Sequence, residues 1–485
     1  MPEKKPNVFL IVLDATRVDH LSCYGYHRST SPNIDKLAKE GVKYTSAISS
    51  APWTLPSFAS LFTGMYRSNH DVDRSNPFLN YKGPTIAELF RDNGYKTVCV
   101  SNNSWISEYT KFNRGFQNFL KVWQYFQINE DVLGERAVEK HNHRPIDVLK
   151  SLFRGNIIKN SFNTIYGLYF YKRRDFGAIK VNQLFKSWLN SMDSKKSPIF
   201  ACLHFLEPHP PFKPPKEFAK KFISTKEDQK IASKINQDFF GYISGEKKIN
   251  DEELRILADL YDAEINYFDY RVGELIRLLK KHDLYENSII IIAADHGTNL
   301  GEHGLLDHQY CLYDTLIRIP LIIKFPYGEH KGINDDQIQN IDILPSLIDS
   351  VGFNRENATF DGVDVFPDSK TKREYTYSEY LEPQPSIQTL INRFGNVGVK
   401  KYDRSLRCIR TKKHKLIEFS SGEVELYDVE KDPAEMNNVY YGNDDIAKDY
   451  LSRLNDKFGP IETCTKSGFE IDKEIKKRLE DLGYF

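Results

Sequence analysis

Asp295 and His296, two residues that can bind a metal, stand directly after an apolar run in this sequence. The run, Ser288–Ala294, has the length and composition of a buried parallel strand. The carboxyl ends of such strands face the ligand crevice of an open α/β sheet. A carboxylate oxygen and an imidazole nitrogen at that edge form a ligand pair for a divalent metal. The alternative is a polar turn in which Asp295 caps a helix.

A second acid, Asp14, ends a second apolar run of strand length, Asn7–Leu13. One aspartate at a strand end is readily explained as a solvated turn residue. Two strands of one chain that both end in an acid favour a metal site at the carboxyl edge of the sheet, because parallel strands end at the same edge.

Thr54 lies two residues before Pro56 in the segment 49–64. Proline suits the first turn of a helix, because its missing N–H group would be unpaired there. Thr54 is therefore expected at or just before a helix amino terminus, where the helix dipole favours anions. A neighbouring metal would lower the pKa of its hydroxyl and make it a nucleophile. The alternative is that Thr54 is only the N-cap of this helix.

These segments, together with others in the same order, resemble the sulfatase family of the alkaline-phosphatase superfamily. The matching stretches run along nearly the whole chain and comprise residues 12–26, 31–42, 54–64, 204–215, 261–275, 295–304, 313–323, 410–416 and 425–438. An ordered series of this kind is much more specific than any single motif. The resemblance implies an α/β fold and a metal-dependent hydrolase of sulfuric or phosphoric esters.

The sequence departs from the family where the chemistry takes place. Sulfatases carry Cys or Ser followed by x-Pro-x-Arg, and the Cys or Ser is oxidised to formylglycine; this chain has Thr54 and Phe58 in place of the first residue and the arginine. Oxidation of a threonine would give a ketone instead of an aldehyde. The paired acids of the family are Asp14 and Ala15 here, so one ligand is absent. A threonine nucleophile resembles the phosphodiesterases, phosphomutases and phosphotransferases of the superfamily.

The resemblance implies one divalent cation held by Asp14, Asp295, His296 and the oxygen of Thr54. Calcium, manganese, zinc and magnesium are all compatible with these ligand types. His209 would contact the anionic oxygen or the leaving group of the substrate; a structural histidine is the alternative.

Further polar residues are expected around this centre. His308 stands where sulfatases commonly have lysine, and it would donate to the transferred group or protonate the leaving oxygen near neutral pH. Asn102 or Asn103 would supply an amide contact to the oxyanion; a turn asparagine is the alternative. Arg17 would bind the substrate or brace the site from behind.

Three functions follow from this reading. The first is hydrolysis of a phosphate ester, phosphodiester or sulfate ester through an ester of Thr54, with phosphate and phosphodiester turnover expected to exceed sulfate turnover. The second is transfer of a substituted phosphate to a glycan or lipid headgroup. The third is a non-catalytic relative that binds anionic esters. The expected substrate is a small molecule, a glycan or a lipid headgroup that carries the anionic ester.

Alternating strands and helices must position these residues. The apolar patterns predict strands at Asn7–Leu13, Lys96–Ser101, 198–205, Ser288–Ala294 and 320–325, and helices at 33–40, from Thr54, at 85–93, Asp251–Lys281 and 343–351. This alternation predicts a doubly wound, mostly parallel sheet with helices on both faces.

The catalytic domain is expected at residues 1–373 and a smaller α+β subdomain, with an antiparallel sheet and a helix at 472–482, at residues 374–485. Residues 120–180 interrupt the alternation as an aromatic and basic insertion, which is either a wall of the site or a packing elaboration. Residues 216–250 are expected to form a loop with short helices.

The bulk composition excludes several classes of protein. The chain has 485 residues and 67 basic against 67 acidic residues, a balance that argues against nucleic acid as the main partner. The six cysteines are scattered without a CxxC motif, which favours buried thiols over a disulfide framework. No signal peptide and no run of about 18 apolar residues is present, so no transmembrane segment and a cytoplasmic location are expected. These features leave the oligomeric state open.

Overall fold

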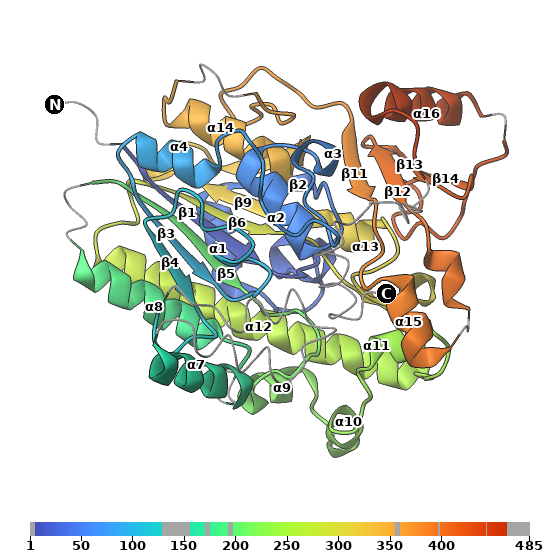
Figure 1. The fold of residues 1–485 in the computed structure, drawn as a ribbon, viewed down its shortest axis with the longest axis horizontal. Coiled ribbons are helices and arrows are strands. Elements are labelled where there is room, and N and C mark those ends of the chain that lie inside the picture. Colours follow the sequence, from blue (N-terminus) through green and yellow to red (C-terminus); the bar gives the residue numbers. More distant parts are fainter. Residues whose placement is uncertain are drawn as a thin grey trace.

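The computed structural model describes residues 5–128, 156–169, 175–192, 197–354, 359–395, 398–442 and 444–462. Its centre is an eight-stranded sheet in the order β10-β2-β9-β6-β1-β5-β3-β4. Helices cover both faces, with α2, α4 and α14 on one side and α8 and α12 on the other (Figure 1). The predicted doubly wound α/β fold is confirmed.

The middle of the sheet is formed by three strands that are buried along their whole length. They are β1 (Asn7–Leu13), β5 (Ile199–Phe205) and β6 (Ser288–Ala294). Strand β1 pairs in parallel with both neighbours, and the register sets Leu13 opposite Ala294. Since β1 and β6 end at the same level, the residues that follow them, Asp14 and Asp295, emerge side by side. Burial on both faces explains why these strands read as continuous apolar runs.

Three strands of the sheet, β2, β10 and β4, were not predicted, and one strand runs against the others. Strands β2 (Val42–Ile48) and β10 (Gly332–Gln339) form one edge and mix polar with apolar residues. Strand β9 (Arg318–Lys324) lies antiparallel to β2 and β6. The remaining strands of this sheet are β3 (Lys96–Ser101) and β4 (Asn118–Lys121).

The helices bury two separate apolar cores against the two faces of the sheet. One core contains residues of α2 (Thr54–Thr63), α4 (Ile86–Asp92) and α14 (Ile343–Ser350). The other contains residues of α1 (Pro32–Glu40), α8 (Ala178–Ser191) and α12 (Asp251–Lys281). Capping boxes begin α4 and α12, which explains why both starts were readable from the sequence.

A smaller antiparallel sheet follows in the C-terminal part of the chain. It consists of β11 (Thr376–Tyr380), β12 (Leu406–Arg410), β13 (His414–Phe419) and β14 (Val424–Asp428). Helix α16 (Asp445–Phe458), which was not predicted, packs against it. The helix expected at 472–482 lies outside the described residues, and the domain boundary after residue 373 stays a prediction.

The remaining elements are short or lie at the periphery. They are α3 (Arg67–His70), α7 (Ile157–Tyr169), α9 (Lys216–Phe222), α10 (Lys226–Ala232), α11 (Phe239–Ile243), α13 (Asp314–Ile317), α15 (Ile387–Phe394), β7 (Asn299–Leu300) and β8 (Leu306–Asp307). The expected insertion is described only in part, because residues 129–155 and 170–174 lie outside the described ranges. None of the helices within the described ranges is long and apolar enough to cross a membrane.

The cysteines of the described ranges are free thiols, as predicted. Cys99, Cys202, Cys311 and Cys408 are buried and Cys23 is half-buried, whereas Cys464 lies outside these ranges.

Candidate active site

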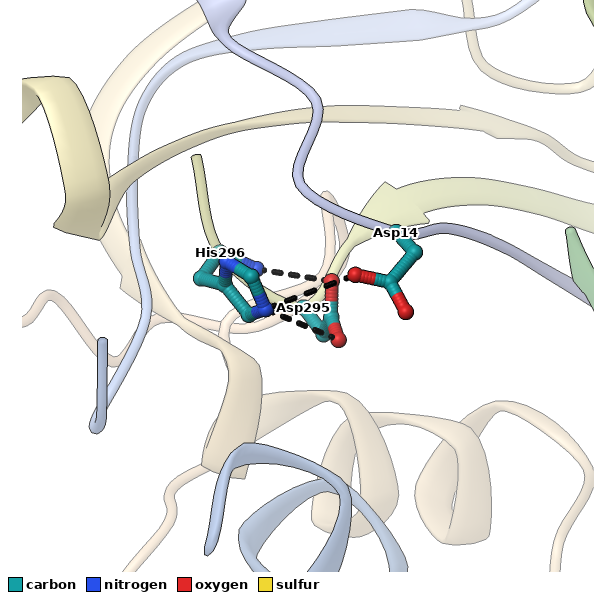
Figure 2. A group of neighbouring side chains, drawn as sticks. All are labelled: Asp14, Asp295 and His296. Carbon is teal, nitrogen blue, oxygen red and sulfur yellow. Dashed lines mark hydrogen bonds and ion pairs between the residues drawn. The ribbon is translucent and has the colours of Figure 1, made fainter. Parts of the chain in front are cut away.

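Asp14, Asp295 and His296 converge at the carboxyl ends of β1 and β6 (Figure 2). His296 Nε2 lies 3.5 Å from Asp14 Oδ1 and 3.5 Å from Asp295 Oδ2. One ligand atom from each residue lies within 4.8 Å of the others, and all three side chains are buried. The parallel register of the two strands brings these residues together although 281 positions separate Asp14 from Asp295 along the chain.

The two carboxylates of this group need a positive charge that the neighbouring side chains supply only in part. Within the described residues, neither Asp14 Oδ1 nor Asp295 Oδ2 has a hydrogen-bond partner. Burial, together with the charge of Asp14, raises the pKa of Asp295 well above its usual range. Burial also opposes ionisation of Asp14, but His209, His204 and His296 outweigh it and hold the pKa of that carboxyl below its usual range. A divalent cation would compensate both acids.

The imidazole of His296 is oriented as a metal ligand. Its Nδ1 donates to the carbonyl oxygen of Gly297 at 2.7 Å, which leaves the lone pair of Nε2 directed at the two acids. Burial lowers the pKa of His296 to about 3, so the ring is neutral at physiological pH. A neutral imidazole is the form that binds metals.

Thr54 is the first residue of α2, and it completes this group. Its Oγ1 lies 3.2 Å from His296 Nε2. The N-cap residue of α2 is Trp53, so the Thr54 hydroxyl is not used as the cap. Ligand atoms bound to one cation at about 2.0–2.6 Å and about 90° to each other are roughly 2.8–3.7 Å apart. The separations of 3.2 and 3.5 Å fit such a centre.

Helix α2 is held in place by the main chain of Asp295. The hydroxyls of Ser49 and Ser57 both donate to the carbonyl oxygen of Asp295, at 2.6 and 2.7 Å. The side-chain amide of Asn340 donates to Ser57 Oγ at 3.1 Å. These bonds fix the start of the helix, and with it Thr54, against the end of β6.

Two further histidines lie beside the metal group. The ring centroid of His308 is 4.5 Å from that of His296 and 5.0 Å from that of His209. Burial lowers the pKa of His308, but the paired carboxylate of Asp307 outweighs it and raises that pKa overall. Burial lowers the pKa of His209, whose Nδ1 donates to Pro210 O at 2.7 Å.

The two asparagines after β3 take different places. Asn103 Nδ2 donates to Asp14 Oδ2 at 3.2 Å, whereas Asn102 Nδ2 donates to the carbonyl oxygen of Phe176 at 2.9 Å. Of the two alternatives, Asn103 is therefore the one in contact with the metal group. Asn102 is buried nearby with its Oδ1 unpaired among the described residues.

Arg17 braces the turn that follows Asp295 and His296. Its guanidinium pairs with Asp19 at 2.7 Å and with Glu302 at 2.5 Å, and it donates to the carbonyl oxygen of Thr298 at 3.3 Å. These partners engage a side chain that is only 5% exposed. The geometry matches the bracing role more closely than direct contact with a substrate.

Ala15, in the turn after β1, stands where related sulfatases carry a second acid, and its backbone geometry is unusual. Ala15 has φ 55°, in the left-handed region that most side chains avoid. The hydroxyl of Tyr261 holds this turn, because it donates to Ala15 O at 2.9 Å and accepts from the backbone N–H of Arg17 at 2.8 Å. Tyr261 was not predicted as part of the site.

One buried neighbour of Asp14 was also missed. His204 Nε2 lies 3.2 Å from Asp14 Oδ2, and the side chain is fully buried. The available signal was an imidazole within the apolar strand β5, whose other residues are all apolar.

Comparisons with known proteins agree over nearly the whole chain. The family model described as Sulfatase matches residues 6–353, and that of the N-sulphoglucosamine sulphohydrolase C-terminal region matches residues 301–459. The uncharacterized sulfatase YidJ of Escherichia coli K12 is 25% identical over 490 residues, which are 94% of this chain and 89% of that protein. The arylsulfatase of Clostridium perfringens is 24% identical over 493 residues, 93% of each chain.

Solved structures are similar over a comparable length. A protein in complex with its substrate D-glucosamine-2-N,6-O-disulfate superposes with a TM-score of 0.70 at 19% identity, covering 96% of this chain and 100% of its own. The phosphonate monoester hydrolase of Agrobacterium radiobacter superposes with a TM-score of 0.67 at 22% identity, covering 93% and 95%. At these identities the two structures establish the shared fold.

Proposed function

The chain belongs to the sulfatase family and is a hydrolase of sulfuric or phosphoric esters, and from this premise we propose that it cleaves phosphate monoesters or diesters through Thr54. The observation that carries the proposal is the place of the Thr54 hydroxyl, 3.2 Å from His296 Nε2 at the start of a buried helix. The nucleophile position therefore holds an alcohol beside the metal group.

The chemistry of an alcohol favours phosphorus over sulfur here. Formylglycine is an aldehyde whose hydrate expels sulfate from carbon when the second hydroxyl collapses to the carbonyl. Thr54 has one hydroxyl, so its ester is released only when water attacks the central atom again. That second in-line displacement is a normal step of phosphoryl transfer, in which positioned charges stabilise the equatorial oxygens.

The metal ion is held in this proposal by Asp14, Asp295, His296 and Thr54 Oγ1. Their separations and unpaired carboxylate oxygens support a single divalent cation, with calcium, manganese, zinc and magnesium as candidates. When bound, the metal supplies positive charge that lowers the pKa of a bound hydroxyl and stabilises the anionic ester.

The reaction in this proposal has two displacement steps at phosphorus, in which Thr54 and His308 take part. The Thr54 hydroxyl loses its proton to solvent, a bond forms between Oγ1 and phosphorus, and the bond from phosphorus to the leaving oxygen breaks. His308 donates the proton that the leaving oxygen takes up. Water then attacks phosphorus and gives one proton to His308, the bond from phosphorus to Oγ1 breaks, and Thr54 takes a proton back from solvent. In this proposal His209 and Asn103 contact the ester oxygens; their positions beside His308 and Asp14 support these roles.

A substrate panel tests the proposal. The protein is stripped with a chelator, reloaded separately with calcium, manganese, zinc or magnesium, and assayed on aryl esters of phosphate, phosphodiester, phosphonate and sulfate. We expect phosphate or phosphodiester turnover to exceed sulfate turnover with at least one metal. Sulfate turnover that dominates with every metal would contradict the assignment, and turnover that requires an added acceptor alcohol would identify a phosphotransferase.

A further inference from the structure

His204 is a polar residue that the fold has placed within the apolar centre of the molecule. It belongs to β5, its exposed fraction is 0%, and the register sets it opposite Val12 of β1. Within the described residues, neither of its ring nitrogens makes a well-aligned hydrogen bond, although Nε2 lies 3.2 Å from Asp14 Oδ2. Burial of an imidazole without hydrogen bonds is costly, so its presence calls for an explanation.

The two carboxylate oxygens of Asp14 face different neighbours. Oδ1 lies 3.5 Å from His296 Nε2, on the side of the metal group. Oδ2 lies 3.2 Å from His204 Nε2 and accepts from Asn103 Nδ2 at 3.2 Å. His204 therefore contacts the oxygen that is turned away from the proposed metal ligands, and it is not one of them.

The second neighbour of His204 is Phe58. The ring centroids are 4.8 Å apart and the rings meet edge to face at 68°. Phe58 is fully buried in α2, one turn after Thr54, at the position where the related motif carries an arginine. A phenyl ring can neither donate to a carboxylate nor carry charge, so position 58 offers Asp14 neither a cation nor a hydrogen-bond donor.

We propose that His204 is a positioning residue that supplies, from strand β5, the polar contact to Asp14 that Phe58 cannot supply from helix α2. The imidazole and Asn103 hold Oδ2 from one side, and this directs Oδ1 toward His296 and Asp295. The inference rests on the metal site of the proposed function. Removal of a group that hydrogen-bonds to a metal ligand and orients it commonly weakens metal binding by about 10–100-fold.

Metal binding is the direct readout. Titration of the chelator-stripped protein with Mn²⁺, followed by calorimetry, should give a Kd that is about 10–100-fold weaker for His204→Leu than for the parent. His204→Gln, which keeps an N–H donor, should bind more tightly than His204→Leu. Unchanged affinity in His204→Leu would refute the role of His204, whereas a parent that binds neither Mn²⁺ nor the other candidate metals would refute the metal site itself.

The geometry also allows a rescue experiment. In His204→Gly the space beside Phe58 is vacated, and Phe58→Arg in that background places a cation next to Asp14 from the other element. We expect the Phe58→Arg/His204→Gly variant to bind Mn²⁺ about tenfold more tightly than His204→Gly alone, since residues that share a partner are energetically coupled. The matched control, Phe58→Met/His204→Gly, fills similar space without charge and should give no rescue.

Each outcome of the rescue is decisive. Equal recovery in the arginine and methionine variants would mean that His204 serves only to fill volume, and it would overturn the proposal. Recovery with arginine alone would support it. If the glycine variants fail to fold, as judged by thermal unfolding of the metal-free proteins, the comparison of His204→Leu with His204→Gln decides the question by the same titration.

Discussion

Thr54 carries a single hydroxyl where sulfatases carry formylglycine. The role of this hydroxyl can be tested by replacing the side chain. Replacement by alanine removes the oxygen that forms the proposed covalent ester, so Thr54→Ala should lose at least about 10³-fold in kcat/KM on the best substrate of the panel. Thr54→Ser keeps the hydroxyl and should retain measurable activity. Mass spectrometry should find an unmodified threonine in the resting protein. A near-normal rate for Thr54→Ala would remove this residue from the mechanism.

In the proposed site, Asp295 contributes both a side-chain metal ligand and the carbonyl oxygen that anchors α2. Asp295→Ala keeps the carbonyl and removes the carboxylate, so the variant should lose bound metal while α2 stays attached to β6. Elemental analysis after gel filtration measures the metal content, and Asp449→Ala, which changes a half-exposed acid on α16, serves as the control. Full metal content in Asp295→Ala would exclude the proposed ligand set.

The residues of the site were predictable from the sequence to different degrees. Asp14, Asp295 and His296 directly follow apolar runs, so their place at a strand end was readable. His204 contacts Asp14 because β5 lies beside β1 in the sheet. The order of strands in a sheet cannot be read from the spacing of residues in the sequence. The choice between Asn102 and Asn103 likewise depends on which way one turn directs two adjacent side chains.

The strands of the main sheet also differ in how readily the sequence predicts them. Strands β1, β5 and β6 are buried on both faces, and their unbroken apolar runs made them recognisable. Strand β10, with the sequence GINDDQIQ, lies at the sheet edge and carries many polar residues, so it has no apolar signature. The antiparallel direction of β9 follows from how the chain connects, which local composition does not determine.

An aromatic cluster formed by α7 and the segment after β4 tests whether the insertion is a wall of the site or a packing elaboration. Phe162 and Tyr125 are 48% and 51% exposed, with ring centroids 5.2 Å apart, and Lys180 lies over the Tyr125 ring. Exposed aromatic rings beside a lysine suit the bulky, anionic part of a substrate. Phe162→Ser should therefore raise KM more for large esters than for small ones, while Ile158→Ser on the same helix should not. An equal response of all substrates would assign the cluster to packing.

At the scale of the whole molecule, a buried ionic cluster joins the C-terminal sheet to the main one. Lys415 Nζ of β13 lies 2.9 Å from Asp314 of α13 and 2.6 Å from Glu435, and its side chain is fully buried. Arg410 of β12 pairs with the same aspartate at 2.9 Å. The family resemblance suggested a second subdomain, but the sequence did not indicate this joint, because its charges lie far apart along the chain.

Removing one partner of this cluster should weaken the joint. Lys415→Met leaves Asp314 and Glu435 buried without their shared cation, which should lower the free energy of unfolding by about 3–5 kcal/mol. Chemical denaturation followed by circular dichroism measures the loss. Lys412→Met removes an exposed ion pair between the same subdomain and Asp335 of β10, and it should leave the unfolding midpoint unchanged. Equal midpoints for both variants would show that the cluster does not hold the two sheets together.

The carbonyl of Asp295, which accepts hydroxyl hydrogen bonds from Ser49 and Ser57, has a consequence for how such a site can diverge. The proposed metal ligand Asp295 and the helix that carries Thr54 are both anchored at this one peptide unit, and none of these anchoring bonds involves the side chain at position 54. That side chain can be exchanged between cysteine, serine and threonine while its distance to the metal group is preserved. The scaffold thus permits the reaction type to change through a single residue, and the surrounding contacts to adapt afterwards.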